Sequence, residues 1–343
     1  MTDATPPADD NAGPAKGRPS KAKPAKPEPA KAEIATVAVP IEFAAADKRC
    51  GFVAILGETN AGKSTLVNRL VGTKVTIVSH KVQTTRMPIR GIAMAGASQL
   101  VFIDTPGIFK PRRRLDRAMV HAAWGGAKDA DAVVLLIDAQ REIDADVRRM
   151  VERLGEMKTT CFLALNKIDQ VEKPKLMLLA QELNAGAKFD ATFMISALKG
   201  SGVEHLKSAL AASVPQGPWH YSPDDVTDLP LRLLAAEITR EKLYARLHDE
   251  LPYATTVETT MWTDLKKKGV RIEQTIFVER DSQKSIVLGK GGRAIKQISM
   301  ESRTELTEIM ERDVHLFLFV KVREGWEHDP ERYREMGLEF PSE

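Results

Sequence analysis

The sequence predicts a doubly wound α/β domain followed by a smaller α+β domain. Apolar strand patterns alternate with helical patterns from Arg49 to about Pro215, which is typical of a sheet with helices on both faces. The stretch 215–230 then carries four prolines, a composition that indicates a linker. Beyond it the alternation stops, and a different order of helices and strands follows. With 343 residues, the chain is long enough for about two domains with buried cores.

Composition limits the class of protein. The chain is 43% apolar and 28% charged with a formal net charge of +3, which is ordinary for a soluble protein and too little to imply nucleic acid by itself. No uncharged apolar run reaches the ~18 residues of a membrane span, so we expect no transmembrane segment. The two cysteines, Cys50 and Cys161, cannot build a disulfide framework and favour a reducing compartment such as the cytoplasm.

Residues 1–47 form a segment of Ala, Pro and Lys with few large apolar side chains. Such a segment buries too little surface to offset its ordering entropy, so we expect a disordered tail. It starts with acidic residues and has no apolar centre, unlike a signal peptide or a mitochondrial presequence. The other boundaries that we expect are a first domain over 48–215, a linker over 216–229, and a second domain with a C-terminal extension over 230–343.

The first domain contains several apolar segments with strand character. They cover residues 52–56, 89–94, 100–103, 132–137, 160–165 and 192–195. Helical patterns lie between most of them, for example over 65–70, 146–157 and 176–184. In a doubly wound sheet, ligands bind at the carboxyl ends of the strands. The motifs described next all lie at those ends.

A phosphate-binding loop follows the first strand. Its residues match the pattern G-x-x-x-x-G-K-[ST] and are Gly57, Glu58, Thr59, Asn60, Ala61, Gly62, Lys63 and Ser64, with Thr65 at the start of the helix. Glycine lets backbone amides approach phosphates closely, and the helix N-terminus adds partial positive charge. We expect Lys63 to reach the β- and γ-phosphate oxygens and the Ser64 hydroxyl to bind Mg²⁺.

A second polar motif, Asp104, Thr105, Pro106 and Gly107, follows the strand at 100–103. A carboxylate at a strand end can hold Mg²⁺, usually through water, and the Gly107 amide is free to meet a γ-phosphate. Taken alone, this sequence is also a plausible turn. It lies 47 positions after Gly57, a spacing that fits one helix and two strands between the two motifs.

The motif after the strand at 160–165 indicates a guanine base. It contains Asn166, Lys167 and Asp169. The Asp169 carboxylate can accept hydrogen bonds from the N1–H and 2-amino groups of guanine, whereas adenine would leave it unpaired. Lys167 offers its aliphatic stem to the base plane, and Asn166 can tie this loop to the phosphate loop. The last strand ends in Ser196, Ala197 and Leu198, where we expect the Ala197 amide to meet the guanine carbonyl.

These motifs resemble the translation-factor-like class of GTPases. Residues 83–86, Gln-Thr-Thr-Arg, are similar to the first switch of that class, in which a threonine contacts Mg²⁺ and the γ-phosphate. Thr85 is our first choice for this threonine and Thr84 our second. The resemblance implies a doubly wound P-loop GTPase domain that binds GTP and GDP. It implies catalytic roles for Lys63, Ser64, Thr85 and Gly107, and Mg²⁺ held by Ser64, Thr85 and Asp104.

One residue departs from Ras-like GTPases. Ile108 stands where those proteins have the glutamine that orients the attacking water. Isoleucine neither donates nor accepts a hydrogen bond, so we expect slow intrinsic hydrolysis unless another element supplies order or charge. In related GTPases with an apolar residue there, an asparagine at the position of Asn60 helps to hold K⁺ in place of an arginine finger. The alternative is that Asn60 only caps the loop.

The second domain contains a glycine loop between two helical patterns. We expect a helix over 231–248, strands over 253–262 and 270–279, a short helix, a helix over 293–310 and a strand over 314–322. Gly289, Lys290, Gly291 and Gly292 form a G-x-x-G between the helices, the pattern with which RNA-binding KH domains clamp four nucleotides. That pattern alone is a weak signal, but the order of elements is similar to the α+β arrangement of a type II KH domain.

Charge in the second domain is local rather than general. Residues 231–343 contain 19 Lys or Arg and 21 Asp or Glu. Basic residues nevertheless cluster around the glycine loop, namely Lys284, Lys290, Arg293, Lys296 and Arg303. Such a cluster is an electrostatic footprint for phosphate. We expect single-stranded RNA to be bound by Lys284, Gly289, Lys290, Gly291, Gly292, Arg293 and Lys296.

A GTPase domain followed by a type II KH domain closely resembles the Era family of bacterial GTPases, from Arg49 to about Leu338. Further agreement lies in residues 50–52, 83–86, 251–253, 278–280, 314–316 and 325–326. The resemblance implies a switch that binds near the 3′ end of 16S rRNA through the KH domain and assists assembly of the 30S ribosomal subunit. It also implies a peripheral association with the inner membrane, for which the sequence offers no inserting segment.

Two alternatives stay open at this point. In one, the chain is chiefly an RNA-binding scaffold with nucleotide as a structural ligand, which Ile108 favours. In the other, it is a peripheral membrane GTPase. The second alternative requires a basic amphipathic helix, whereas the helix expected over 231–248 has mixed charge.

Overall fold

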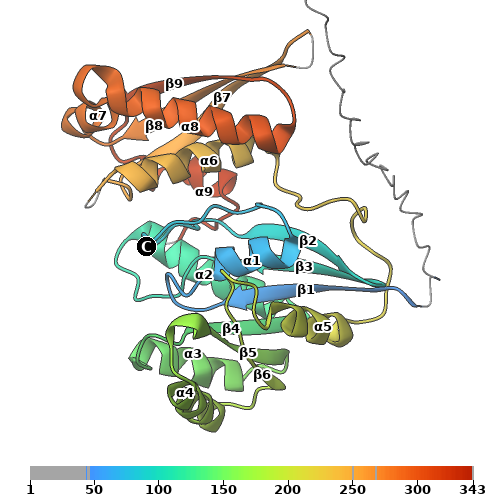
Figure 1. Cartoon of the computed structure of the whole chain (residues 1–343). Helices are drawn as coiled ribbons and strands as arrows, with labels where there is room; N and C mark the ends of the chain where they lie inside the picture. The colour runs from blue at the N-terminus through green and yellow to red at the C-terminus, as the bar shows by residue number, and fades with distance from the viewer. Residues whose placement is uncertain (1–43, 45–46, 249–250, 267–268, 342–343) are drawn as a thin grey trace, which may run out of the picture. The chain divides into compact units, whose positions relative to one another are not determined.

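The computed structural model describes residue 44 and residues 47–248, 251–266 and 269–341 of the chain. The tail predicted over 1–47 lies almost wholly outside these residues. The described part contains a six-stranded sheet and a three-stranded sheet, each with its own helices (Figure 1). This confirms the prediction of an α/β domain followed by a smaller α+β domain.

The first sheet has the strand order β2-β3-β1-β4-β5-β6. Its strands are β1 (Arg49–Leu56), β2 (Ile89–Ala95), β3 (Ser98–Asp104), β4 (Ala132–Asp138), β5 (Thr160–Asn166) and β6 (Ala191–Met194). β2 pairs antiparallel with β3 because only the turn at 96–97 joins them, whereas the other pairs are parallel. The sheet is therefore mixed. β1 lies between β3 and β4, so the strand order reverses there and opens a crevice at the carboxyl end of β1.

Helices cover both faces of this sheet (Figure 1). One face carries α1 (Lys63–Val71) and α5 (Val203–Ser213), and the other carries α2 (Arg114–Lys128), α3 (Ala145–Gly155) and α4 (Lys173–Gly186). Each face has its own core of buried apolar side chains, such as Leu66 and Leu206 on the first and Met150 and Leu179 on the second. The alternating burial of strand side chains between these two cores fixes the register of the sheet.

The second sheet has the order β7-β8-β9. Its strands are β7 (Thr256–Asp264), β8 (Val270–Val278) and β9 (Val314–Val322), and its helices are α6 (Leu231–Arg246), α7 (Asp281–Leu288) and α8 (Arg293–Met310). β8 and β9 run parallel because α7 and α8 form the crossover between them. β7 starts three residues later than predicted, because turns occupy residues 251–254. A short helix, α9 (Pro330–Glu335), follows β9.

The predicted linker over 216–229 packs along the first sheet rather than crossing solvent freely. Gln216 forms a bridge with Arg49, and Thr227 forms one with Gly91. Ile92 N donates to Val226 O at 2.8 Å. The linker thus pairs with the start of β1 and with β2. Within the described residues, no helix is long and apolar enough to cross a bilayer.

Candidate nucleotide site and RNA groove

A cavity of about 730 Å³ opens at the carboxyl ends of the strands of the first sheet. It is lined by the phosphate loop, by residues 78–85 and by the loops after β3, β4, β5 and β6. The lining includes Thr59, Asn60, Gly62, Lys63, Ser64, Thr65, Thr84, Thr85, Gly107, Asn166, Lys167, Asp169, Ser196, Ala197 and Leu198. The structure therefore brings together, around one cavity, motifs that lie up to about 140 positions apart in the sequence.

The phosphate loop has the backbone that its glycines predict. Gly62 has a φ of 100°, and a Cβ there would lie 2.4 Å from Asn166 Nδ2. Lys63 is 6% exposed, and its Nζ donates to Gly57 O at 3.1 Å and Glu58 O at 2.8 Å. Burial lowers the pKa of Lys63 to about 8, an effect that the Asp104 carboxylate opposes. The ammonium is thus held at the loop, where phosphate oxygens would replace water around it.

Asp104 is the centre of a cluster of buried oxygens. Its Oδ2 accepts hydrogen bonds from Ser64 Oγ (2.7 Å), Thr76 Oγ1 (2.8 Å) and Thr85 Oγ1 (3.2 Å). Among the described residues, Asp104 Oδ1 is fully buried and has no hydrogen-bond partner. A hard cation that prefers oxygen ligands fits this set of donors. Sequence reasoning missed Thr76, because no motif marks it and only the folded loop brings it to Asp104.

The two candidate threonines of the first switch point to different places. Thr85 Oγ1 lies 2.9 Å from Ser64 Oγ and belongs to the oxygen cluster. Thr84 Oγ1 instead donates to Lys81 O at 2.7 Å, within its own loop. The geometry favours our first choice, Thr85, for a contact to a metal ion.

In the second motif, Gly107 packs so closely that a Cβ would lie 2.6 Å from Thr59 Cγ2, which explains the glycine there.

Asn166 ties three loops together at the base-binding end. Its Nδ2 donates to Ala61 O at 2.8 Å, as the sequence predicted for the phosphate loop. Its Oδ1 accepts the Ala197 N–H at 2.9 Å, so in this structure Asn166 holds the amide that we had assigned to the guanine carbonyl. Hydrogen bonding from Ser196, with help from Lys199, lowers the pKa of Asp169. That carboxylate is therefore ionised at neutral pH, as pairing with guanine requires.

Lys167 Nζ pairs with Asp138 Oδ2 at 2.6 Å, which holds its stem along the wall of the cavity. Arg69 donates to the carbonyl oxygens of Ala197 and Leu198 and so braces the loop after β6. Another arginine, Arg141, places its Nη1 3.4 Å from Thr59 O at the phosphate loop. No sequence motif marks Arg69 or Arg141, since both act through tertiary contacts.

Ile108 is 8% exposed and packs into the core beneath α2 and α3. Its backbone N–H donates to Gly57 O at 3.0 Å. The side chain therefore takes no part in the cavity, in agreement with the absence of any water-orienting group at this position.

Asn60 adopts a φ of 63°, and its Nδ2 donates to His80 O at 2.8 Å. Asn60 thus connects the phosphate loop to the loop that carries Thr85.

The glycine loop of the second domain joins α7 to α8. Gly289, Gly291 and Gly292 have φ values of 71°, 62° and 74°. A Cβ on Gly289 would lie 2.7 Å from the Cβ of Ala294, whereas Gly291 and Gly292 have open space around them. Lys290, Arg293 and Lys296 are exposed, and Lys284 is half-buried. The loop therefore has exposed basic side chains beside it, as contact with phosphate requires.

Family models agree with this division of the chain. A model described as "50S ribosome-binding GTPase" matches residues 52–167, and a model described as "KH domain" matches residues 250–327. The chain is 63% identical to GTPase Era of Rhizobium meliloti (strain 1021) over 297 residues, which cover 87% of this chain and 95% of that protein. The chain belongs to the Era family of GTPases. The predicted family resemblance is confirmed.

Other Era proteins are similarly close. GTPase Era of Agrobacterium fabrum is 62% identical over 304 residues, covering 89% of this chain and 96% of that protein. A structure of Era with MgGDPNP and nucleotides 1506–1542 of 16S ribosomal RNA matches with a TM-score of 0.81 and 34% identity, over 84% of this chain and 99% of that one. A variant of Aquifex aeolicus Era bound to GDP and AlF4⁻ matches with a TM-score of 0.80 and 35% identity, over the same shares of the two chains.

Proposed function

We propose that this Era-family GTPase binds the 3′ region of 16S rRNA through its glycine loop and assists assembly of the 30S ribosomal subunit. The observation that carries the proposal is the match, over 84% of this chain, to an Era structure that holds nucleotides 1506–1542 of 16S rRNA. The loop at 289–292 supports it, because its glycines allow close approach of an RNA backbone and Lys290 and Arg293 are exposed beside it.

The test is RNA binding by a Gly291→Asp variant. Gly291 has a φ of 62° and no atom within 4 Å of an added Cβ, so the substitution adds a carboxylate without a clash. Asp also tolerates this left-handed backbone better than most residues. We expect the affinity for an RNA of nucleotides 1506–1542 to fall about tenfold or more, because the new charge opposes phosphate. Affinity would be measured by fluorescence anisotropy at constant salt.

Gly337→Asp is the matched control, since Gly337 has a φ of 63° and equally open surroundings but lies outside the glycine loop. We expect it to bind RNA like the unaltered chain. Equal losses in the two variants would contradict a role for the glycine loop. Unaltered binding by Gly291→Asp would contradict it as well.

The oxygen cluster around Asp104 supports a separate role for each residue of the nucleotide site. Lys63 would contact the β- and γ-phosphates, Ser64, Thr85 and Asp104 would hold Mg²⁺ directly or through water, and the Gly107 amide would meet the γ-phosphate. Bound Mg²⁺ supplies charge neutralisation at the phosphates. GTP would thereby order the loops around Thr85 and Gly107, and hydrolysis would release them. The proposed domains are 48–215 for nucleotide, 216–229 as the linker and 230–343 for RNA.

K⁺ is the further cation that the site is proposed to use. Asn60 lies between the phosphate loop and the backbone of residues 79–80, and Ile108 is buried away from the cavity. A monovalent cation beside Asn60 would add to the positive charge of Lys63 and take the place of an arginine finger. We expect GTP hydrolysis to be faster in KCl than in NaCl at equal ionic strength, measured as phosphate release. Equal rates in the two salts would leave Asn60 with its structural contact to His80 alone.

A second candidate function is an RNA-binding scaffold in which GTP turnover is incidental. The burial of Ile108 favours it, because the chain then lacks a side chain that orients the attacking water at this position. Single-turnover hydrolysis with and without the rRNA fragment separates the two: acceleration by RNA supports the switch.

Because ribosome assembly takes place in the cytoplasm, we expect the protein to act there. Fractionation of cells would show whether part of the protein associates with the inner membrane.

A further inference from the structure

The loop between α1 and β2, residues 72–88, is held by the second domain as well as by its own domain. Arg240 Nη2 of α6 donates to Thr84 O at 2.6 Å. Val78 N donates to Glu241 Oε1 at 2.9 Å, and Lys74 Nζ pairs with the same carboxylate at 2.7 Å. Because this loop has no regular secondary structure of its own, its position depends on these contacts together with those that Asn68 and Asp104 make to it within the first domain.

Arg86 makes the most extensive of these contacts. It is 4% exposed, and its guanidinium donates to Thr255 O (2.8 Å), Tyr244 Oη (3.0 Å), Tyr253 O (3.1 Å) and Pro252 O (3.2 Å). Its Cζ lies 5.8 Å from the ring centroid of Tyr244 and 5.6 Å from that of Trp326. We call these five residues of the second domain, Tyr244, Pro252, Tyr253, Thr255 and Trp326, the Arg86 socket.

The socket is neutral although it holds a cation. Among the described residues, Arg86 forms no ion pair with a carboxylate, and its Nε has no hydrogen-bond partner. Burial lowers the pKa of Arg86. Burying a charge against neutral acceptors is costly, and an apolar side chain of similar volume would fill such a space at lower cost. A role besides packing would account for the arginine.

The neighbouring residue indicates that role. Thr85 lies in the oxygen cluster, 2.9 Å from Ser64 Oγ, while Arg86 lies in the socket. The peptide between them therefore joins the nucleotide site directly to the second domain. We propose that Arg86 is a positioning residue for GTP hydrolysis, which fixes Thr85 at the magnesium site by anchoring the next residue in the KH domain. This inference rests on the proposed role of Thr85.

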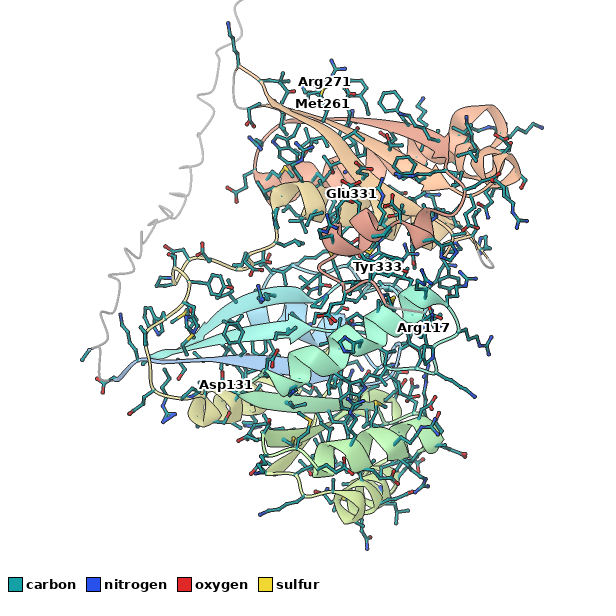
Figure 2. All side chains as sticks on the ribbon, turned by 180° about the vertical axis from the view of Figure 1, so that it is seen from behind. Arg117, Asp131, Met261, Arg271, Glu331 and Tyr333 are labelled. Atoms are coloured by element: carbon teal, nitrogen blue, oxygen red, sulfur yellow. The ribbon has the colours of Figure 1, made fainter. Side chains whose placement is uncertain are left out.

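The same socket also reaches the helix that follows the Asp104–Gly107 motif. Trp326 is 1% exposed and packs with Leu115 and Met119 of α2 and with Tyr333 of α9. Figure 2 labels Tyr333 on α9 and Arg117 on α2, the helices that this cluster joins. Trp326 Nε1 donates to Ala254 O at 3.2 Å, beside the carbonyls that accept from Arg86. The socket therefore packs against α2, the helix that follows the Asp104–Gly107 motif.

The experiment compares Arg86→Lys with the unaltered full-length chain, without RNA. Lysine keeps the charge but cannot donate to four acceptors from a planar fork. We expect kcat for GTP to fall about tenfold or more, because a displacement of about 1 Å at a reacting group has effects of this size. The Mg²⁺ concentration for half-maximal rate should rise, while GDP affinity should stay within about twofold. A purely structural role would change stability without changing the Mg²⁺ dependence.

Arg90→Lys is the matched control. Arg90 lies on β2, four residues along the chain, and pairs at 2.7 Å with Asp228 at the surface. We expect its kcat and its Mg²⁺ dependence to match those of the unaltered chain.

Tyr244→Phe removes a single hydrogen-bond acceptor from the socket. It should lower kcat as Arg86→Lys does, but by a smaller factor. It serves in place of Arg86→Lys if that variant does not fold.

The Thr85→Ala variant tests whether Arg86 acts on hydrolysis through Thr85. If Arg86 acts through Thr85, adding Arg86→Lys to Thr85→Ala should cause no further loss of kcat. The same fold loss in both backgrounds would overturn the inference. A Thr85→Ala chain with unaltered kcat and Mg²⁺ dependence would instead overturn the proposed role of Thr85. The two failures are therefore distinguishable.

Discussion

Lys63 shows how burial prepares a single side chain for phosphate. Its ammonium has only the carbonyl oxygens of Gly57 and Glu58 as hydrogen-bond partners in the described structure, and burial lowers its pKa to about 8. A bound nucleotide would surround the same group with negative charge, which favours the protonated form. The pKa of Lys63 should therefore rise on binding. Binding and protonation are then linked, and the direction of the linkage follows from the rise of this pKa on binding.

We predict that the chain takes up a proton when it binds GDP above pH 8. Below about pH 7 Lys63 is charged in both states, so its protonation does not change. Between pH 7 and 8.5 the free chain increasingly loses this proton and the complex keeps it, so affinity falls as pH rises. Calorimetry in two buffers of different ionisation enthalpy should give an uptake above half a proton at pH 8.5.

Lys63→Arg is the control for this measurement, because arginine stays charged throughout the range. If that variant binds GDP, the uptake in this pH range should be absent. An uptake of the same size in Lys63→Arg would assign the proton to another group. A pH-independent affinity of the unaltered chain would show that Lys63 does not titrate in this range.

Residues of the site could be predicted from sequence where a motif fixes them relative to the end of a strand. Asn166, for example, makes the predicted contact to the phosphate loop. Thr76 and Arg141 could not be predicted, since their partners Asp104 and Thr59 lie on other elements. The Ala197 amide shows the limit of a motif. Its position was predictable, but its hydrogen bond to Asn166 depends on how two loops meet.

At the scale of elements, strands were easier to predict than helices. Each segment predicted as a strand of the first sheet is one, because buried parallel strands form short continuous apolar runs. The sequence indicates α2 and α5 less clearly. The α2 sequence contains the pair Gly125–Gly126, which lowers helix propensity, and the small Ala and Ser residues of α5 blur its apolar periodicity although Ala itself favours a helix. Packing against the sheet stabilises both helices.

The loop at 72–88 is the element whose structure the sequence could not predict. It has no apolar periodicity, and its partners Glu241, Arg240 and Tyr244 lie more than 150 positions away. Long-range contacts of this kind carry no local signal. The motif at 83–86 indicates a switch, but nothing in it shows that the Arg86 side chain points away from the nucleotide site and binds the second domain.

At the scale of the whole molecule, the two domains share part of a core. Ile77 belongs to the loop after α1, yet it is fully buried and packs with Leu234, Ile238 and Val270 of the second domain. The adjacent Val78 is 41% exposed. A side chain from the nucleotide domain therefore completes the core beneath α6. The stability of the second domain should depend on it.

We predict that Ile77→Ala lowers the free energy of unfolding by about 2–4 kcal/mol, because it removes buried methyl groups and leaves a cavity. Val78→Ala, one residue along the chain, should change it by less than about 0.5 kcal/mol, since Val78 is 41% exposed and lies outside that core. Urea unfolding followed by tryptophan fluorescence measures both, with Trp262 and Trp326 reporting on the second domain. Equal shifts of the unfolding midpoint in the two variants would show that Ile77 does not complete that core. A large shift for Ile77→Ala alone would show that folding of the second domain uses a residue of the first.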